Sequence, residues 1–223
     1  MALDKNKTDL ALGREVHAHL EAMGVETPMV RLIKEEEDTL REDSERLFSL
    51  LHHNLGLDLT DESLMETPRR LAKMYHTELF WGLDYKNFPK IMTIGNSMEY
   101  GSMVLERGIS VKSMCEHHWM PIRGQAYVAY IPEGKVIGLS KLNRVVEFFC
   151  RRPQVQERLV EQIYHTLSYL LETPNVAVVI KAEHFCVSFR GKEDEGGDTL
   201  TSKLGGVFFN GPLRAEFLQA IKI

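Results

Sequence analysis

Four consecutive residues, Cys115-Glu116-His117-His118, together with the distant Cys186, place the strongest constraint on how this sequence can fold. Cys115 and His118 are three positions apart, so one tight turn can bring both side chains to a single metal ion. Cys186 can supply a third ligand from a distant strand. Zinc accepts cysteine and histidine ligands in tetrahedral geometry, and a catalytic zinc site keeps one of its four positions for water. The pattern therefore predicts that two segments far apart in sequence meet at a water-activating metal site.

The same residues also allow a simpler interpretation, in which the cysteines are small buried apolar side chains and the adjacent histidines lie on a solvated surface. The sequence His184-Phe185-Cys186 favours the metal site, because residues two apart in an extended strand share a face. His184 would then point into the same pocket as Cys186. His117 and His184 would remain beside the metal as proton carriers, and metal ligands with spare imidazoles are typical of a hydrolytic site.

The composition is that of an ordinary globular protein. Of the 223 residues, 43% are hydrophobic and 26% are charged, which is enough apolar material for one good core or two small ones. The net charge of −5 argues against a general nucleic-acid binder, which usually carries a broad basic face. The odd number of cysteines, three, favours a reducing compartment. Because the N-terminal segment is charged and no apolar run could span a bilayer, we expect a cytoplasmic protein without a membrane partner.

The hydrophobic periodicity changes along the chain and predicts an α+β protein with two parts. Residues 1–98 are expected to form a helical N-terminal region, and residues 99–223 an antiparallel sheet with two helices in the order ββααββ. Thr67-Pro68 is a typical helix start, with Thr67 as the N-cap. The expected helices cover 8–23, 31–55 and 69–81 and two more begin at Leu139-Ser140 and Pro153, while the expected strands cover 103–111, 125–131, 175–190 and 204–209.

Basic residues near two expected helix starts indicate anion binding. Lys141 and Arg144 share a helical face just after Ser140, where free backbone amides and the helix dipole already favour anions. Arg70 and Lys73 repeat this arrangement after Thr67-Pro68. The alternative for both pairs is a capped helix whose basic side chains are simply solvated.

Two further positions could contact a ligand. Arg190 would lie on the same strand face as Cys186, roughly 13 Å along the strand from it, where the far end of an elongated ligand could reach. The alternative is an exposed arginine at the sheet edge. Gln156-Glu157 could pair with the amide and amine edge of a guanine, although a glutamate in a first helical turn usually only compensates the helix dipole.

Taken together, five motifs in a fixed order resemble GTP cyclohydrolase I of the zinc-dependent type. The resemblance extends from about Glu62 to Leu204-Gly205-Gly206, and the segment before it carries no motif. The motifs are Ser63-Leu64-Met65-Glu66-Thr67-Pro68-Arg69-Arg70, Cys115-Glu116-His117-His118, Ile137-Gly138-Leu139-Ser140-Lys141, Arg152-Pro153-Gln154-Val155-Gln156-Glu157-Arg158-Leu159 and His184-Phe185-Cys186.

The resemblance implies a tunnelling fold, whose antiparallel sheets join edge to edge into rings of five. Two stacked rings would give a homodecamer with active sites at the subunit interfaces, which would also protect the open sheet edges. The implied reaction converts GTP and water into formate and 7,8-dihydroneopterin triphosphate, the first step of tetrahydrofolate and pterin biosynthesis. It would use one zinc ion per subunit to activate the water that attacks C8 of the guanine.

Site residues follow from the resemblance by position. Cys115, His118 and Cys186 would bind zinc. His117 would protonate the imidazole nitrogen during ring opening, and His184 would carry protons in formate release and in the later ribose rearrangement. Ser140 would touch the sugar. The guanine would be held by Gln156 and Glu157, and the triphosphate by Arg70, Lys73, Lys141, Arg144 and Arg190.

One segment departs from the family pattern. Residues 192–198 contain four carboxylates where relatives often have a hydroxyl-rich loop near the phosphates, so we expect a mobile solvated loop that weakens triphosphate binding unless it points outward. The residues also allow two other function classes. A zinc-stabilised nucleotide-binding protein without turnover would not need His117 and His184. A nucleoside deaminase would usually show a Pro-Cys-x-x-Cys partner and a glutamate in His-x-Glu order at the first ligand, and the predicted ligands carry neither.

Overall fold

The computed structural model describes residues 3–30, 37–194 and 196–222. Within it the chain divides into two compact units, one formed by residues 1–3 and 28–81 and the other by residues 4–27 and 82–223. The second unit thus includes the first helix of the chain as well as the sheet. The domain boundary expected at residue 98 stays a prediction. No helix in the described part of the chain is both long enough and apolar enough to cross a membrane.

The smaller unit is helical, as the periodicity predicts. It contains α2 (Glu37–Asn54), α3 (Thr67–Lys73) and a π-helical turn, η2 (Met74–Leu79). Ser44 of α2 lies 2.8 Å from the ring of His76, oxygen to nitrogen, and Phe48 stacks on Tyr75 with ring centroids 5.6 Å apart. The helix start predicted at Thr67 is one residue off, because Glu66 occupies the N-cap and no side chain caps the helix. The beginning of the helix expected over 31–55 lies outside the described residues.

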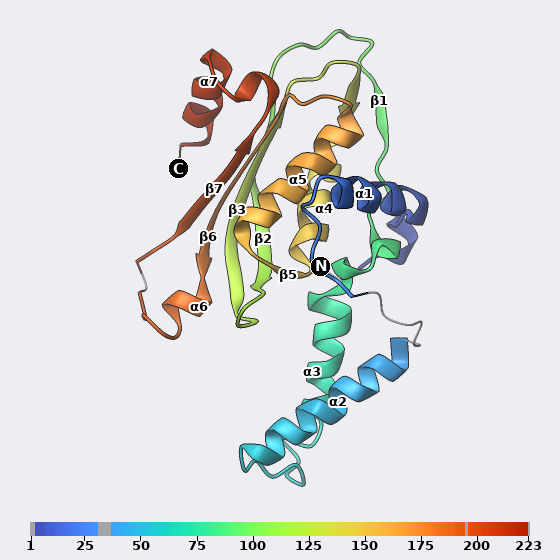
Figure 1. Cartoon of the computed structure of the whole chain (residues 1–223), viewed down its shortest axis with the longest axis vertical. Coiled ribbons are helices and arrows are strands. Elements are labelled where there is room, and N and C mark those ends of the chain that lie inside the picture. Colours follow the sequence, from blue (N-terminus) through green and yellow to red (C-terminus); the bar gives the residue numbers. More distant parts are fainter. Residues whose placement is uncertain (1–2, 31–36, 195, 223) are drawn as a thin grey trace. The chain divides into compact units, whose positions relative to one another are not determined.

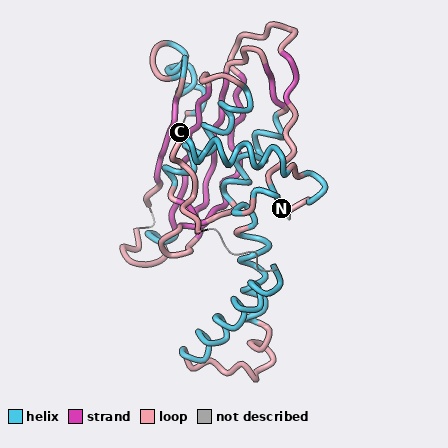
Figure 2. The backbone as a smooth tube through the Cα atoms, turned by 45° about the vertical axis from the view of Figure 1, so that its right-hand side comes forward, coloured by secondary structure: helices cyan, strands magenta, loops and turns pink. Residues whose placement is uncertain are grey.

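The larger unit is built on a five-stranded sheet in the order β5-β2-β3-β6-β7 (Figures 1 and 2). All neighbouring strands are antiparallel except β2 and β5. A separate two-stranded ladder joins β1 and β4. The predicted ββααββ order is confirmed, with the short β1, β4 and β5 added to it. The strands are β1 (Thr93–Gly95), β2 (Val104–Cys115), β3 (Pro121–Tyr130), β4 (Lys135–Ile137), β5 (Pro153–Gln154), β6 (Val176–His184) and β7 (Thr199–Leu204).

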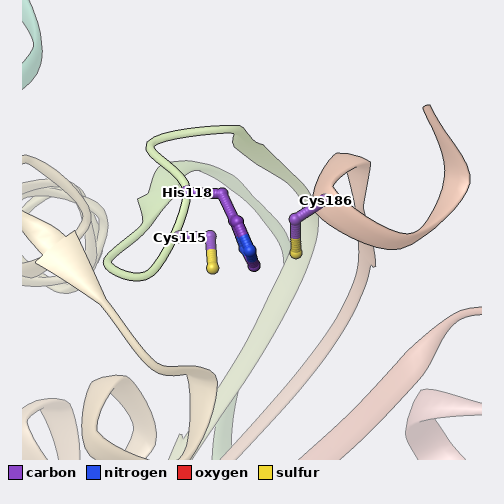
Figure 3. Close-up of side chains that lie close together, drawn as sticks. All are labelled: Cys115, His118 and Cys186. Atoms are coloured by element: carbon purple, nitrogen blue, oxygen red, sulfur yellow. The ribbon is translucent and has the colours of Figure 1, made fainter. Parts of the chain in front are cut away.

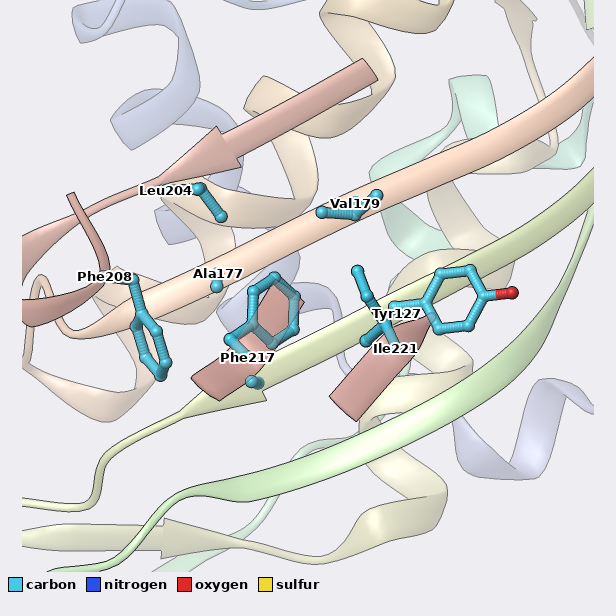
Figure 4. Packing of buried hydrophobic residues seen from close by; sticks show 8 residues of the cluster. Tyr127, Ala177, Val179, Leu204, Phe208, Phe217 and Ile221 are labelled. Atoms are coloured by element: carbon cyan, nitrogen blue, oxygen red, sulfur yellow. The ribbon is translucent and has the colours of Figure 1, made fainter. Parts of the chain in front are cut away.

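Both faces of this sheet are covered. Helices α4 (Leu139–Cys150) and α5 (Gln156–Leu171) pack on one face, each with a buried apolar stripe (Figure 1). The turn η5 (Gly206–Phe208) and helix α7 (Pro212–Ile221) pack on the other, where Phe208, Phe217 and Ile221 bury Tyr127 and Val179 of the sheet (Figure 4). Alternate residues of β3 and β6 therefore face two different apolar layers, which explains why the second half of β3 and the first half of β6 are buried on both faces.

Several element predictions were wrong at their ends. The strands expected over 103–111 and 125–131 both reach further towards the turn between them, as β2 extends to Cys115 and β3 begins at Pro121. The strand expected over 175–190 stops at His184 and is followed by a helical turn, α6 (Phe185–Ser188). The last strand covers Thr199–Leu204 instead of 204–209, where a 3₁₀ turn forms. Pro153 belongs to the two-residue strand β5, so the following helix begins at Gln156. The helix starting at Leu139 and the helix expected over 8–23, which is α1 (Leu10–Ala22), are confirmed.

A fully buried arginine ties the N-terminal segment to the sheet unit. Arg152 has no solvent-exposed surface, and its guanidinium bonds to Glu26 at 2.9 Å, to the Thr27 hydroxyl at 3.3 Å and to the carbonyl of Gly82. The guanidinium carbon also lies 4.9 Å from the ring centroid of Phe148. Glu26, 10% exposed, in turn accepts a hydrogen bond from the Tyr85 hydroxyl, and burial raises the pKa of that phenol. The sequence gives no sign of the ion pair between Arg152 and Glu26, because the two residues are far apart in the chain.

Replacing Arg152 with methionine is expected to lower the free energy of unfolding by about 3–5 kcal/mol, because the Glu26 carboxylate would stay buried without its partner. Urea denaturation followed by circular dichroism, at one protein concentration, measures the change. Arg69→Met is the matched control, since Arg69 forms an exposed pair with Glu66 and should change stability by less than about 1 kcal/mol. Equal effects of the two substitutions would contradict the structural role of Arg152.

Candidate metal centre and active site

A tight turn between β2 and β3 presents the first two candidate metal ligands. Cys115 is the last residue of β2, and its amide donates to the Met120 carbonyl at 2.8 Å while its carbonyl accepts from the Trp119 amide at 2.9 Å. Trp119 takes a left-handed conformation (φ 51°), as a turn this tight requires. The Glu116 amide donates to the Gln154 carbonyl of β5 at 3.0 Å. The turn is therefore anchored on two sides by backbone hydrogen bonds.

The structure brings the three predicted ligands together. The ligand atoms of Cys115, His118 and Cys186 all lie within 4.8 Å of one another (Figure 3). Zinc bonds of about 2.0–2.3 Å would require only a small inward movement of these side chains. Two thiolates and one imidazole are ligands that zinc prefers, and three protein ligands are the number found at catalytic zinc sites. The donor set therefore fits a metal ion with an open coordination position.

Cys186 reaches this group from a helical turn, although the sequence predicted a strand there. It lies in α6, directly after β6 ends at His184. Partial burial and then a hydrogen bond to Cys115 raise the pKa of the Cys186 thiol. Because a metal binds the thiolate, binding must release protons and must be stronger at higher pH.

His117 stands beside the ligands with an exposed side chain. Its Nδ1 lies 3.9 Å from the Cys115 sulfur, and its side chain is 65% exposed. Glu116, the residue before it, forms a partly buried ion pair with Arg158 of α5 at 2.6 Å. This pair fixes the turn to the helix that carries Gln156 and Glu157. The sequence did not predict the Glu116–Arg158 pair, because a charged residue within a motif gives no sign of its partner.

His184, the second predicted proton carrier, is half-buried at the end of β6. Its Nε2 lies 2.8 Å from the side-chain oxygen of Gln156, the first residue of α5. Burial lowers the pKa of His184, and the nearby Glu157 carboxylate opposes this shift. Gln156 is 1% exposed, whereas Glu157 is exposed. The predicted contacts of both residues with guanine stay predictions.

Beside Glu157 there is an open pocket of about 480 Å³. Its lining includes Glu157 and Arg158 from α5, Thr201 from β7 and Gly24 from the segment after α1. The pocket thus places a carboxylate in a concave surface of suitable size for a small molecule.

The basic residues predicted at the start of α4 are in place, and the structure adds two more. Ser140, Lys141 and Arg144 lie in the first two turns of α4. Partial desolvation, and then the positive charges of Arg144, Lys90 and Lys7, lower the pKa of Lys141. Lys7 and Lys90 are held together by a backbone hydrogen bond of 2.8 Å, and Lys7 also pairs with Asp4 at 2.6 Å. Sequence reasoning missed Lys7 and Lys90 because only the fold brings them to α4.

The other residues predicted to bind the triphosphate have exposed side chains. Arg190 follows α6, and its positive charge slightly opposes the rise in the pKa of the Cys186 thiol. Arg70 and Lys73 are exposed on α3 of the helical unit. In the acidic segment, Asp198 pairs with Lys181 of β6 at 3.2 Å, while Glu195 lies outside the described residues. Cys150 is buried, as expected, and burial raises its pKa to about 12.

Comparison with known proteins decides the family. The profile described as GTP cyclohydrolase I matches residues 44–222. The chain belongs to the GTP cyclohydrolase I family. A relative from Aeromonas hydrophila named GTP cyclohydrolase 1 is 53% identical over 216 residues, covering 95% of this chain and 99% of the relative. A protein of the same name from Aeromonas salmonicida is 54% identical, over 93% of this chain and 95% of the relative. Another from Shewanella denitrificans is 52% identical, over 93% of this chain and 96% of the relative. This family resemblance agrees with the metal-ligand group at the end of β2.

Proposed function

We propose that this chain is a zinc-dependent GTP cyclohydrolase I. It opens the imidazole ring of the guanine in GTP, releases C8 as formate and recyclises the remainder to 7,8-dihydroneopterin triphosphate, the first step towards tetrahydrofolate and related pterins. The observation that carries the proposal is the group Cys115, His118 and Cys186, with His117 beside Cys115 and His184 two residues before Cys186, in a chain of this family.

Cys115, His118 and Cys186 would hold the zinc ion. When bound, zinc lowers the pKa of a water molecule towards neutrality and so supplies a nucleophile at working pH. The protein contributes the proton transfers. His117, exposed and close to the ligands, would donate a proton to the ring nitrogen that leaves C8, and His184 would carry protons in formate release and the rearrangement of the ribose.

Binding of the substrate is assigned to the charged residues around the site. Glu157 would accept hydrogen bonds from the guanine, and its position in an open pocket supports this role. Ser140 would touch the sugar. Lys141 and Arg144 would bind the triphosphate at the N-terminus of α4, with Arg190, Arg70 and Lys73 contributing further charge. Lys90 extends this basic group.

Incubation of the purified protein with GTP tests the proposal. We expect stoichiometric formation of formate and of a pterin that becomes fluorescent after oxidation. Removal of zinc with a chelator should stop both products, and addition of zinc should restore them. If GTP is bound but neither product forms with zinc present, the chain is a nucleotide-binding protein without turnover.

Replacing Lys141 with alanine is expected to raise the KM for GTP by about 10-fold to 100-fold, which corresponds to the loss of one charge-assisted hydrogen bond to a phosphate. Lys90→Ala should raise KM less, because Lys90 lies outside α4, whose first turns carry Lys141 and Arg144. Lys112→Ala, an exposed lysine of β2, is the control that should leave KM unchanged. Steady-state kinetics at several salt concentrations measure all three. If the effect of Lys141→Ala is on kcat alone, Lys141 has no role in holding the triphosphate.

The open edges of the sheet support a homodecamer of two stacked rings of five, with active sites shared between subunits. β7 lies at one edge, and β2 pairs with β5 at the other edge only through Met114 and Cys115, so most of β2 presents unpaired backbone groups there. Light scattering on the purified protein should give ten times the chain mass. The three free cysteines fit the cytoplasmic location that we also propose.

A further inference from the structure

Gln156 is buried at the junction of α5, β6 and β7, where its side chain has four hydrogen-bond partners. Its side-chain nitrogen lies 3.1 Å from the Ile180 carbonyl, 2.9 Å from the Thr199 carbonyl and 3.1 Å from the Thr201 hydroxyl. Its side-chain oxygen lies 2.8 Å from Nε2 of His184. With 1% of its surface exposed, this side chain has little freedom to turn towards a ligand.

The neighbours of Gln156 fix the orientation of its amide. A carbonyl oxygen can only accept a hydrogen bond, so the group that faces the carbonyls of Ile180 and Thr199 must be the NH₂ group. The reverse orientation would place three carbonyl oxygens against one another in a buried position, with two donors lost. The oxygen of Gln156 therefore faces His184.

This orientation in turn fixes the imidazole of His184. Nε2 of His184 faces an oxygen that can only accept, so Nε2 must carry a hydrogen. In neutral histidine only one ring nitrogen carries a hydrogen, so Nδ1 has the free lone pair. The sheet backbone thus selects one tautomer of the histidine through a single glutamine.

We propose that Gln156 is a positioning residue for His184, which it holds in the tautomer that carries hydrogen on Nε2. The proposal rests on the proposed function and reassigns Gln156, whose donors are used within the protein, from guanine binding to the orientation of a proton carrier. Recognition of the guanine through side chains is then left to Glu157, which is exposed in the pocket next to it.

Long-range proton–nitrogen NMR spectra of the zinc-loaded protein, with ¹⁵N-labelled histidine, test the tautomer directly. We expect the signals of His184 to show hydrogen on Nε2 and a free lone pair on Nδ1. A wild-type protein with the hydrogen on Nδ1 would overturn the proposal whether or not any variant folds. A protein with the expected tautomer but without formate production would refute the proposed function and leave the orientation of His184 standing.

Kinetics of three variants separate positioning from guanine binding. Gln156→Met should lower kcat by about 10-fold to 100-fold, because it removes the hydrogen bond that orients His184. KM should change little, and His184 should show a mixture of tautomers. Gln156→Glu keeps an acceptor for Nε2–H, but its second oxygen faces the Ile180 and Thr199 carbonyls, so it should recover part of kcat only at low pH, where that oxygen carries a proton. Glu157→Gln, the adjacent control, should raise KM and leave the tautomer unchanged. A rise in KM for Gln156→Met with an unchanged kcat and tautomer would return Gln156 to guanine binding.

Discussion

Replacing Cys186 with alanine is expected to remove bound zinc and to lower GTP ring opening by about 10³-fold or more. The loss corresponds to the several kcal/mol that a metal ion contributes to a transition state as a Lewis acid. With only Cys115 and His118 left, the site has two protein ligands, too few for stable zinc binding at a catalytic centre. Elemental analysis of the purified variant gives the zinc content, and formate release gives the activity.

The fold of this variant should be preserved, because Cys186 lies in a short, partly exposed helical turn outside the buried layers. Circular dichroism checks this point. Cys150→Ala is the matched control, since Cys150 is buried away from the ligand group and its thiol stays protonated. The control should keep full zinc content and activity below its unfolding temperature. A Cys186→Ala variant that retains stoichiometric zinc would show that this residue is not a ligand.

The end of β6 shows where sequence patterns stop being sufficient. From His184 to Arg190 apolar and polar residues alternate, which is typical of a strand, yet the strand ends at His184. The reason lies in the neighbouring strands. β3 begins at Pro121 and its Ile122 pairs with His184, while β7 pairs only up to Ala182. Residues after His184 have no strand to pair with, so the backbone closes a helical turn, with the Phe189 amide bonded to the Phe185 carbonyl at 3.0 Å.

The ligand group was predictable for a different reason. Cysteine and histidine at Cys115, His118 and Cys186 are defined by their own chemistry and depend little on the secondary structure that carries them. The prediction of three ligands therefore survives a wrong element for Cys186. The order of strands and helices along the chain was predictable because long apolar stripes, such as that of α5, are insensitive to errors at their ends.

Buried polar networks could not be predicted. The partners of Arg152 and Gln156 come from segments that are distant in sequence, namely Glu26 for the first and β6 and β7 for the second. Each side chain alone is compatible with an exposed position. Only the completed fold shows that the backbone around them supplies enough hydrogen-bond partners to bury them.

Replacing His117 with alanine is expected to leave zinc bound and to lower formate release by about 10²-fold to 10⁴-fold, the range of general acid–base catalysis by a positioned side chain. Formate release should fall without loss of zinc because of where His117 lies. His117 is adjacent to the ligand His118, but its ring is 65% exposed and its Nδ1 lies 3.9 Å from the Cys115 sulfur, so it is free to meet a substrate. The turn itself is held by backbone hydrogen bonds and by the Glu116–Arg158 pair, which the substitution leaves intact.

Zinc content and formate release, measured on the same preparation, check this expectation. His53→Ala, an exposed histidine in the last turn of α2, is the control and should behave as the wild type in both assays. His118→Ala should lose zinc and activity together, in contrast to His117→Ala. Normal turnover by the His117→Ala variant would mean that the proton reaches the ring nitrogen by another route, and His117 would then have no chemical role. Loss of zinc in the same variant would instead identify His117 as a ligand and leave the site without an open position for water, because four protein donors close a tetrahedral zinc centre.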